Sequence, residues 1–289
     1  MDTTSAAAPP RRWRAPLLWR VMQVIARLVV TLLARLHVTG DVPAHLRGGP
    51  LILAANHIST FDPIALAAAC RTRRIAPRFL ATGGLFRAPV IGAAMRRCGH
   101  IRVDRRTSAV AEALGSATRA VGEGSVVLVY PEGRIGLDPW MWPERGKTGT
   151  ARLALATGAV VVPVAQWGSH AVLPWAVPQG LGRAVARAVL RRPVVRVHFG
   201  PPVDLSGIDA SSPGAAQRAT ARIIDAIGDS LAPLRPEEPQ LPRYVDVTRP
   251  VDLRRRHRRG VADALPDSAT ADLLDDDDAG QADPAAGLP

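Results

Sequence analysis

Short apolar runs alternate with helical stretches between residues 40 and 199, and few folds accommodate that order. Apolar runs that are too short for globular helices and are bounded by Gly, Pro or polar residues are typical of buried strands. The sequence places strands at 51–55, 78–81, 100–103, 126–130, 159–164 and 194–199. Helices are expected at 63–70, 90–97, 109–121 and 150–157, with a last one at 213–231 capped by Ser211 or Ser212. This alternation predicts an α/β fold with a largely parallel sheet flanked by helices.

The sequence pattern divides the chain into four parts. Residues 1–12 are small, polar and proline-containing, and we expect disorder there. Residues 13–39 carry an N-terminal amphipathic helical segment, and residues 40–232 form the α/β domain. Residues 233–289 are expected to be a disordered tail, first basic and then acidic, with membrane anchoring by the basic cluster as the alternative.

A histidine and an aspartate follow the apolar run at 51–55. The chain continues as Asn56-His57-Ile58-Ser59-Thr60-Phe61-Asp62-Pro63, so His57 stands at the carboxyl end of an expected strand, where parallel sheets open crevices. A neutral imidazole can accept a proton from an attacking hydroxyl, and a carboxylate on its other nitrogen fixes the tautomer. Asp62 can supply that carboxylate. The alternative is a surface histidine beside an aspartate that caps the helix beginning at Pro63.

The folded part is expected to be strongly basic. Residues 261–289 contain eight aspartates and no Lys or Arg, so residues 1–260 carry a formal charge of +20 against +12 for the whole chain. This positive charge predicts an anionic partner, which is a membrane, a phosphorylated substrate or nucleic acid. Aromatic residues make up only 4% of the chain, which disfavours nucleic acid. The two cysteines, Cys70 and Cys98, form no C-x-x-C pattern and favour a reducing compartment.

The N-terminal helix is predicted over residues 13–36. Its arginines Arg14, Arg20, Arg27 and Arg35 fall within about 140° of one another at 100° per residue, and Leu and Val dominate the remainder. No apolar run reaches the ~20 residues that span a bilayer. We expect an interfacial helix on an anionic membrane; the alternative is a helix packed on the domain.

Three further stretches carry candidate ligands for an anionic or polyol substrate. Arg105 ends the strand at 100–103 and is a candidate phosphate ligand or, alternatively, part of a surface ion pair. Glu132 and Gly133 follow the strand at 126–130, where a carboxylate can bind a hydroxyl and a glycine admits a close ligand. The alternative for this stretch is a plain turn. Lys147, the only lysine in the chain, stands between glycines at an expected helix start and is a candidate anion contact. No third ligand stands near His57 and Asp62 at metal-site spacing, so no metal is expected.

These stretches together resemble the four motif blocks of the glycerolipid acyltransferases. The blocks are Asn56-His57-x4-Asp62, Gly99-x-Ile101-x-Val103-Asp104-Arg105, Pro131-Glu132-Gly133 and Val162-Pro163-Val164. The likeness is to bacterial 1-acyl-sn-glycerol-3-phosphate acyltransferases and spans roughly residues 40–205. The stretch from Trp142 to Gly149 is similar to an actinobacterial branch of that family.

The resemblance implies a role for each matched residue. His57 is implied as the general base and Asp62 as its orienting carboxylate. Arg105, Glu132 and Gly133 are implied ligands of the glycerol phosphate, and Pro163 is implied to shape the acyl-donor site. The third block departs from the family, whose members commonly have Glu-Gly-Thr-Arg where this chain has Glu132-Gly133-Arg134-Ile135. The expected phosphate-binding arginine is therefore absent or displaced to Arg134. The family's usual lysine before Leu85-Phe86 is also replaced, by Thr82.

The resemblance thus implies an acyltransferase domain over residues 40–232. Its expected reaction moves a fatty acyl group from acyl-CoA or acyl carrier protein, as co-substrate and without a cofactor, to lysophosphatidic acid, giving phosphatidic acid. The expected location is peripheral, on the cytoplasmic face of the cell membrane. The two alternatives are an acyltransferase of the same fold with another lyso-lipid or polyol acceptor, and a non-catalytic basic protein that binds membrane or nucleic acid.

Overall fold

The computed structural model describes residues 13–47, 49–104, 107–136, 138, 141–173 and 181–236. Its helices are α1 Leu17–Leu33, α2 Asp62–Thr72, α3 Gly83–Arg87, α4 Pro89–Arg97, α5 Thr107–Gly122, α6 Gly149–Thr157, α7 Ser169–Val172, α8 Leu181–Arg191 and α9 Ala215–Leu231. Its strands are β1 Arg35–Gly40, β2 Leu51–Ala55, β3 Arg78–Thr82, β4 Ile101–Val103, β5 Val126–Val129, β6 Val160–Trp167 and β7 Val194–Phe199. Short 3-10 turns lie at η1 Ala44–Leu46 and η2 Ala232–Leu234.

The strands form one sheet in the order β1-β7-β6-β2-β5-β3-β4. Every pair is parallel except β6 with β7, so β1 and β7 run against the other five strands. The prediction of an α/β fold with a largely parallel sheet is confirmed. The central strands β2 and β5 are buried along their whole length, as expected for apolar runs covered on both faces.

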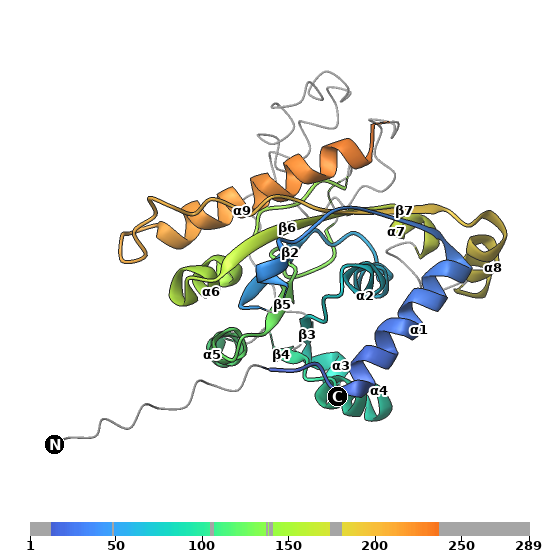
Figure 1. Ribbon diagram of the computed structural model, residues 1–289, viewed down its shortest axis with the longest axis horizontal. Helices are drawn as coiled ribbons and strands as arrows, with labels where there is room; N and C mark the ends of the chain where they lie inside the picture. Colours follow the sequence, from blue (N-terminus) through green and yellow to red (C-terminus); the bar gives the residue numbers. More distant parts are fainter. Residues whose placement is uncertain are drawn as a thin grey trace, which may run out of the picture.

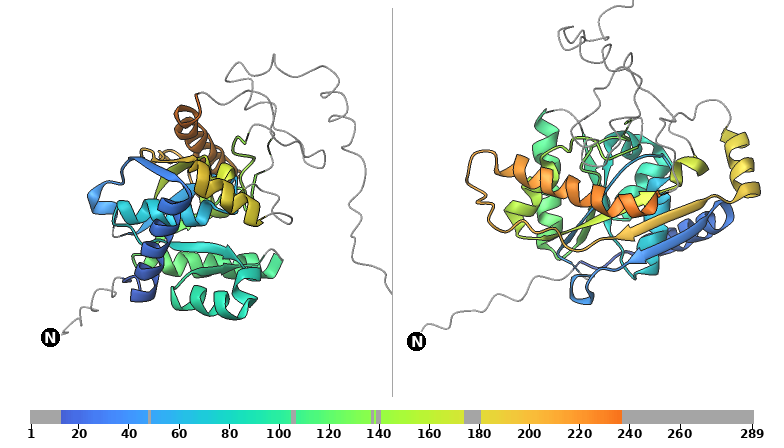
Figure 2. Two further views of the ribbon diagram at one scale, coloured as in Figure 1. Left: turned by 90° about the vertical axis from the view of Figure 1, so that its right-hand side faces the viewer. Right: turned by 90° about the horizontal axis from the view of Figure 1, so that it is seen from above.

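Helices cover both faces of the sheet (Figure 1). On one face, α5, α6 and α9 pack on the alternate side chains Ile52, Ala54 and Val127. On the other face, α2 and the inner side of α1 pack on Leu51, Leu53 and Leu128. The two views in Figure 2 show the same layered arrangement from the side and from above.

The N-terminal helix is shorter than predicted. The helix expected over 13–36 ends at Leu33, because Arg35 to Gly40 pair in parallel with β7 from Val194 to Phe199. The segment assigned to residues 13–39 therefore includes an edge strand of the sheet. On the inner side of α1, Gln23 donates to the carbonyls of Ala67 and Ile75. The helix is thus partly built into the domain, as the alternative expectation held.

The predicted caps and tail also differ from the structure. Helix α9 begins at Ala215 after Gly214, without a side-chain cap from Ser211 or Ser212. The tail was expected from residue 233, but η2 continues to Leu234 and Arg235 is buried. The disorder predicted for residues 1–12, and for the tail from 237 onward, falls outside the described residues. No helix among the described segments is both long and apolar enough to cross a bilayer.

Candidate active site

The candidate site lies where β2 and β5 end side by side. The two strands pair in parallel with Ala54 opposite Val129, so the residues that follow them emerge at the same edge of the sheet. His57 comes from the first strand and Tyr130 from the second. Their rings stack with centroids 4.0 Å apart and planes 16° apart. The expectation that His57 stands at the carboxyl end of a core strand therefore agrees with the structure.

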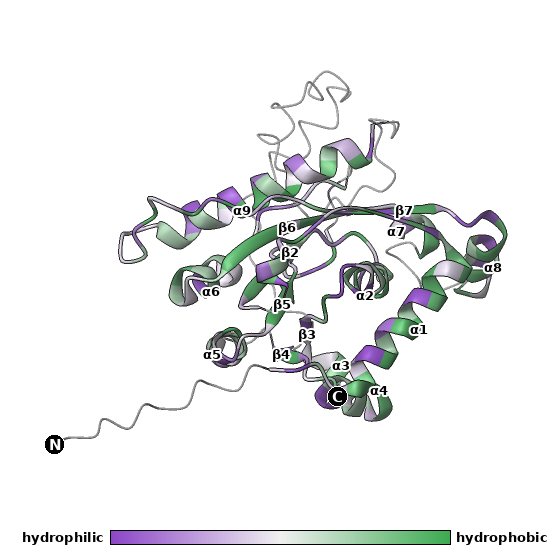
Figure 3. Cartoon of the chain, viewed as in Figure 1, coloured by the Kyte–Doolittle hydropathy of each residue, from purple (hydrophilic) through white to green (hydrophobic). Residues whose placement is uncertain are grey.

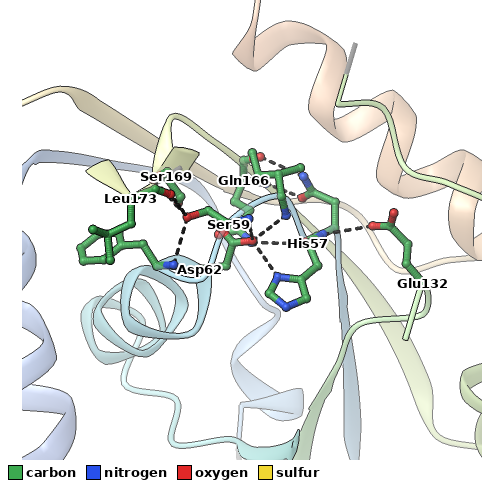
Figure 4. A network of polar contacts seen from close by, with 10 residues as sticks. His57, Ser59, Asp62, Glu132, Gln166, Ser169 and Leu173 are labelled. Carbon is green, nitrogen blue, oxygen red and sulfur yellow. Dashed lines mark hydrogen bonds and ion pairs between the residues drawn. The ribbon is translucent and has the colours of Figure 1, made fainter. Parts of the chain in front are cut away.

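Asp62 holds the imidazole of His57 (Figure 4). The His57 Nδ1 atom lies 2.8 Å from Oδ2 of Asp62, whose side chain is completely buried. An ionised carboxylate only accepts hydrogen bonds, so a neutral imidazole beside one carries its proton on Nδ1 and keeps the lone pair on Nε2. The imidazole side chain is 15% exposed, which leaves it accessible at the surface of the site. This is the arrangement that a general base requires.

The same Asp62 oxygen also fixes residues 57–62, which we call the His57 loop. Oδ2 accepts the backbone N–H groups of Ile58 at 2.6 Å and of Ser59 at 2.8 Å. Asp62 was expected as the N-cap of a helix beginning at Pro63. Instead Asp62 is the first residue of α2, Phe61 is the cap, and the carboxylate points back to the His57 loop.

The hydroxyl of Ser59 is directed away from the imidazole. It donates to the carbonyl of Leu173 at 2.6 Å, lies 3.3 Å from that of Ser169, and accepts the N–H of Phe61. Figure 4 shows these contacts on the side of the loop opposite the ring of His57. Ser59 therefore joins the loop to α7 and shows no hydrogen bond to His57 within the described residues.

Asn56 and Gln166 extend the pairing of β2 with β6 through their side chains. Asn56 Nδ2 donates to the carbonyl of Gln166 at 3.0 Å, and Gln166 N–H returns a bond to Asn56 Oδ1 at 2.8 Å. Gln166 Nε2 also donates to the Asn56 carbonyl. Both side chains are fully buried, so this clamp sets the direction in which the chain leaves β2 toward His57. Asn56 lies in the first motif block; Gln166 carried no signal in the sequence.

Glu132 connects three segments of the site. Its Oε1 accepts the His57 N–H at 3.0 Å and its Oε2 accepts the Glu144 N–H at 2.9 Å. The carboxylate is buried, and a Cβ at Gly136 would approach Oε2 within 2.7 Å. A side chain at Gly136 would therefore have to displace the Glu132 carboxylate where residues 133–136 return past His57, whose carbonyl accepts the Gly136 N–H. The predicted substrate contact of Glu132 stays a prediction, and the structure adds this backbone role.

Gly133 and Lys147 lie together beside Glu132. Gly133 has a φ of +68°, and a Cβ there would come within 3.2 Å of Cδ of Lys147. The Lys147 N–H donates to the carbonyl of Pro131 at 2.8 Å. The aliphatic stem of the only lysine thus crosses the glycine that follows Glu132. The structure brings these predicted residues to one edge with His57.

The remaining predicted residues lie differently. Arg134 pairs with Glu144, with its Nη2 2.7 Å from Oε2. Pro163 lies within β6 opposite Ala54, and its carbonyl accepts the Gly200 N–H; its ring is near Ser230 of α9, on the other side of the sheet from α2. Arg105 lies outside the described residues. The assignments of all three as substrate contacts stay predictions.

Tyr130 has an unusual environment that sequence reasoning missed. Burial, followed by the negative charge of Asp62, raises the pKa of its phenol well above the ordinary value of 10.0. The phenol therefore stays protonated and neutral under the imidazole ring. Its hydroxyl and Oδ1 of Asp62 are both buried without a hydrogen-bond partner among the described residues.

A hollow of about 400 Å³ lies elsewhere, between β4 and α5. Arginines and carboxylates of both signs line it, including the Arg78–Glu123 ion pair, but neither His57 nor Asp62 does. The described residues contain no cluster of three or more His, Cys, Asp or Glu side chains with metal-binding geometry. The paired His57 and Asp62, not the hollow, identify the candidate site.

Comparison with known proteins agrees with this geometry. Residues 35–167, which include β1 to β6 and every residue of the His57 loop, match the acyltransferase family. These residues, just under half of the chain, are therefore similar to acyltransferase domains. The match includes six of the seven described strands and the loop after β2, but not β7.

Similar proteins are found in bacteria and in chloroplasts. An uncharacterised protein of Mycobacterium leprae is 30% identical over 150 residues, covering 48% of this chain and 38% of that protein. A chloroplastic 1-acyl-sn-glycerol-3-phosphate acyltransferase of Brassica napus is 28% identical over 148 residues, covering 50% and 41%. The matches thus span about two fifths of the length of these relatives.

The crystal structure of the 1-acyl-sn-glycerophosphate acyltransferase of Thermotoga maritima has a similar fold. It aligns with a TM-score of 0.51 and 21% identity, covering 73% of this chain and 78% of that one. The likeness concerns the fold, and it extends beyond the sequence-matched residues.

Proposed function

We propose that this protein transfers a fatty acyl group from a thioester, acyl-CoA or acyl carrier protein, to the free hydroxyl of lysophosphatidic acid. The observation that carries the proposal is the bond from His57 Nδ1 to the buried Asp62, which leaves Nε2 as a base. The names of the Brassica napus relative and of the Thermotoga maritima structure support the acceptor class.

In the proposed reaction, Nε2 of His57 takes the proton of the acceptor hydroxyl as its oxygen attacks the thioester carbonyl. The carbon–sulfur bond then breaks, and the imidazolium returns the proton to the departing thiolate. The buried carboxylate of Asp62 stabilises the imidazolium between these two steps. Lys147, Arg105 and Arg134 are the proposed ligands of the acceptor phosphate.

A second acceptor class is favoured by one observation. Arg134, which stands where the family commonly has threonine, is engaged with Glu144. An acceptor without a phosphate monoester, such as another lyso-lipid or a polyol, would need fewer cationic ligands. The decisive experiment incubates the purified full chain with labelled acyl-CoA or acyl carrier protein and a panel of lyso-lipids and polyols. Transfer to lysophosphatidic acid supports the first proposal, and transfer to another acceptor alone supports the second. No transfer to any acceptor would favour a non-catalytic binding protein.

We also propose a peripheral location on an anionic membrane, at the cytoplasmic face. All exposed large hydrophobic side chains of the described residues lie on three parts of the molecule. They are Leu17, Leu18, Val21, Val24, Ile25, Leu28 and Leu32 on α1, Leu85, Val90 and Ile91 on α3 and α4, and Leu181, Val189 and Leu190 on α8. These helices lie along one side in Figure 1 and face the viewer in the left view of Figure 2.

The charge of these helices supports the same partner. None of α1, α3, α4 and α8 contains an Asp or Glu, whereas together they carry Arg20, Arg27, Arg87, Arg96, Arg97, Arg183, Arg187 and Arg191. Figure 3 shows apolar and polar residues alternating along α1. Exposed apolar side chains among cations of one sign are suited to a bilayer with anionic headgroups.

Point variants test this location better than truncation, because the inner side of α1 packs on α2. Leu28→Glu and Leu190→Glu should each weaken sedimentation with vesicles of phosphatidylcholine and phosphatidylglycerol by about tenfold, the value of one buried leucine. Added salt should weaken the binding of the wild type by screening. Ala221→Glu, exposed on α9, is the matched control. Unchanged binding of both leucine variants would remove this face as the membrane contact.

A further inference from the structure

Arg235 is the last buried side chain before the end of the described residues, and it lies between two tryptophans. Its guanidinium carbon is 4.4 Å from the ring centroid of Trp142 and 4.3 Å from that of Trp167, over the ring in both cases. Arg235 is only 8% exposed. A guanidinium over an indole face is held by cation–π attraction, which strengthens when water is excluded.

The two tryptophans come from different parts of the site. Trp167 ends β6, directly after the Gln166 that clamps Asn56. Trp142 is the second residue of the segment 141–147, which returns toward the His57 loop before α6. Both indoles belong to one apolar cluster with Ile58, the residue after His57, and with Leu231 and Leu234 of the chain leading to Arg235.

The segment 141–147 contacts the site at two further points. Its Glu144 N–H donates to Glu132, whose other oxygen accepts the His57 N–H. Its Lys147 N–H donates to Pro131, and the Lys147 side chain crosses Gly133. Between them, Gly146 packs so closely on α9 that a Cβ would approach Thr220 and Ile224 within 2.8 Å. The segment itself has no helix or strand, so these backbone and side-chain contacts hold it in place.

We propose that Arg235 is a positioning residue for acyl transfer. By stacking on Trp142 and Trp167 it fixes the segment 141–147 against the His57 loop and so places Glu144 and Lys147 beside the acceptor. The role in catalysis rests on the proposed function; the role in holding the segment does not. A lysine offers neither the planar fork nor the stacking face of arginine, so Arg235→Lys should fail to replace it although the charge is kept.

The test combines a structural and a kinetic measurement on the full chain. Arg145 and Lys147 are exposed, so trypsin can cut after either when the segment detaches. Limited trypsin digestion, with the new termini at Gly146 and Thr148 identified by mass spectrometry, should be about tenfold faster there in Arg235→Met and Arg235→Lys than in the wild type. Arg222→Met, an exposed arginine on α9, is the matched control and should leave both sites protected.

Steady-state kinetics on the same proteins then test whether Arg235 affects acyl transfer. The acceptor KM should rise about tenfold in both Arg235 variants, with the donor KM unchanged and circular dichroism showing a folded protein. Trp142→Leu should reproduce the effect if Arg235→Met fails to fold. Wild-type cleavage rates in the folded variants would overturn the proposal, and so would faster cleavage with an unchanged acceptor KM. If the wild type transfers no acyl group but the variants are still cleaved faster, the proposed function is contradicted. The role of Arg235 in holding the segment 141–147 is then supported on its own.

Discussion

The backbone N–H of His57 donates to Oε1 of Glu132 over 3.0 Å, although the two residues are 75 positions apart in the chain. The bond exists because β2 and β5 are parallel neighbours that end at the same edge of the sheet. A carboxylate in the loop after the second strand thereby holds the backbone of a residue in the loop after the first. The position of the base thus depends on two loops at once.

Removing the imidazole or its carboxylate should abolish or strongly reduce acyl transfer. We expect no measurable transfer by His57→Ala and a loss of about 10³-fold or more in kcat for Asp62→Asn, as in other enzymes with a carboxylate-oriented histidine. Asparagine keeps an oxygen for the N–H groups of Ile58 and Ser59, so the loop should stay folded. Steady-state kinetics with labelled acyl-CoA measure the effect, with Asp41→Asn as a surface control. Near wild-type turnover by a folded His57→Ala protein would exclude His57 as the base.

Replacing Ser59 should affect stability rather than chemistry. Ser59→Ala removes a buried hydroxyl that bonds to the Leu173 carbonyl and to the Phe61 N–H. Loss of these two hydrogen bonds should lower the free energy of unfolding by about 1–3 kcal/mol. Urea unfolding measures this cost, and kcat should change by no more than about twofold. Ser116→Ala, which removes the hydroxyl that accepts from Arg119, should be near neutral. Complete loss of transfer in a folded Ser59→Ala protein would favour an acyl-serine intermediate instead.

Arg105 should contribute to acceptor binding. Arg105→Ala is expected to raise the acceptor KM by about tenfold or more with little change in the donor KM, because one charge-assisted phosphate contact contributes ~1.5–3 kcal/mol. Arg102 is the matched control: it is half-exposed, and its Nη2 lies 2.6 Å from Oδ2 of Asp104. If the acceptor KM is unchanged, the phosphate site would move toward Arg134 or Lys147.

His100 should make the protein less stable as the pH falls below about 6.5. Burial, followed by the positive charge of Arg78, lowers the pKa of this histidine from 6.5 to about 4. Its Nδ1 also accepts the Phe79 N–H, and Trp19 packs edge-on against the ring. The unfolded chain therefore binds a proton between pH 6.5 and pH 4 that the folded protein does not, so stability falls across this window.

The loss should approach roughly 3 kcal/mol at pH 4, since each unit of pKa shift corresponds to about 1.4 kcal/mol. Urea unfolding of the wild type and of His100→Gln from pH 7 to pH 4 measures it. Glutamine keeps an acceptor but does not titrate, so its pH dependence should be shallower by the slope of one proton. Equal slopes for both proteins would contradict a depressed pKa at His100.

Much of the fold could be predicted because it depends on local pattern. Buried strands such as Leu51–Ala55 are recognisable from continuous apolar residues, and the helix expected at 109–121 lies within α5. The prediction failed where a segment's partner decides its structure. Arg35 and Leu36 continue the helical pattern of residues 13–36, yet they begin a strand because they pair in parallel with β7, 159 residues later. Residues 233–236 were predicted to start a disordered tail, yet Arg235 is buried because it packs between two tryptophans that are distant in sequence.

The sequence by itself determined the order of strands β2 to β7 and of helices α2, α4, α5, α6 and α9. It also determined the place of His57 after a core strand, with Asp62 five residues farther along. These depend on apolar periodicity, turn residues and spacing, which act over a few residues. Only the tertiary structure decided which oxygen of Asp62 meets Nδ1, that Glu132 holds the His57 backbone, that Tyr130 lies under the imidazole, and that Arg134 pairs with Glu144. Each of these contacts joins loops that follow different strands or lie on either side of a turn. Their geometry is therefore set by strand order and register, which short-range patterns do not encode.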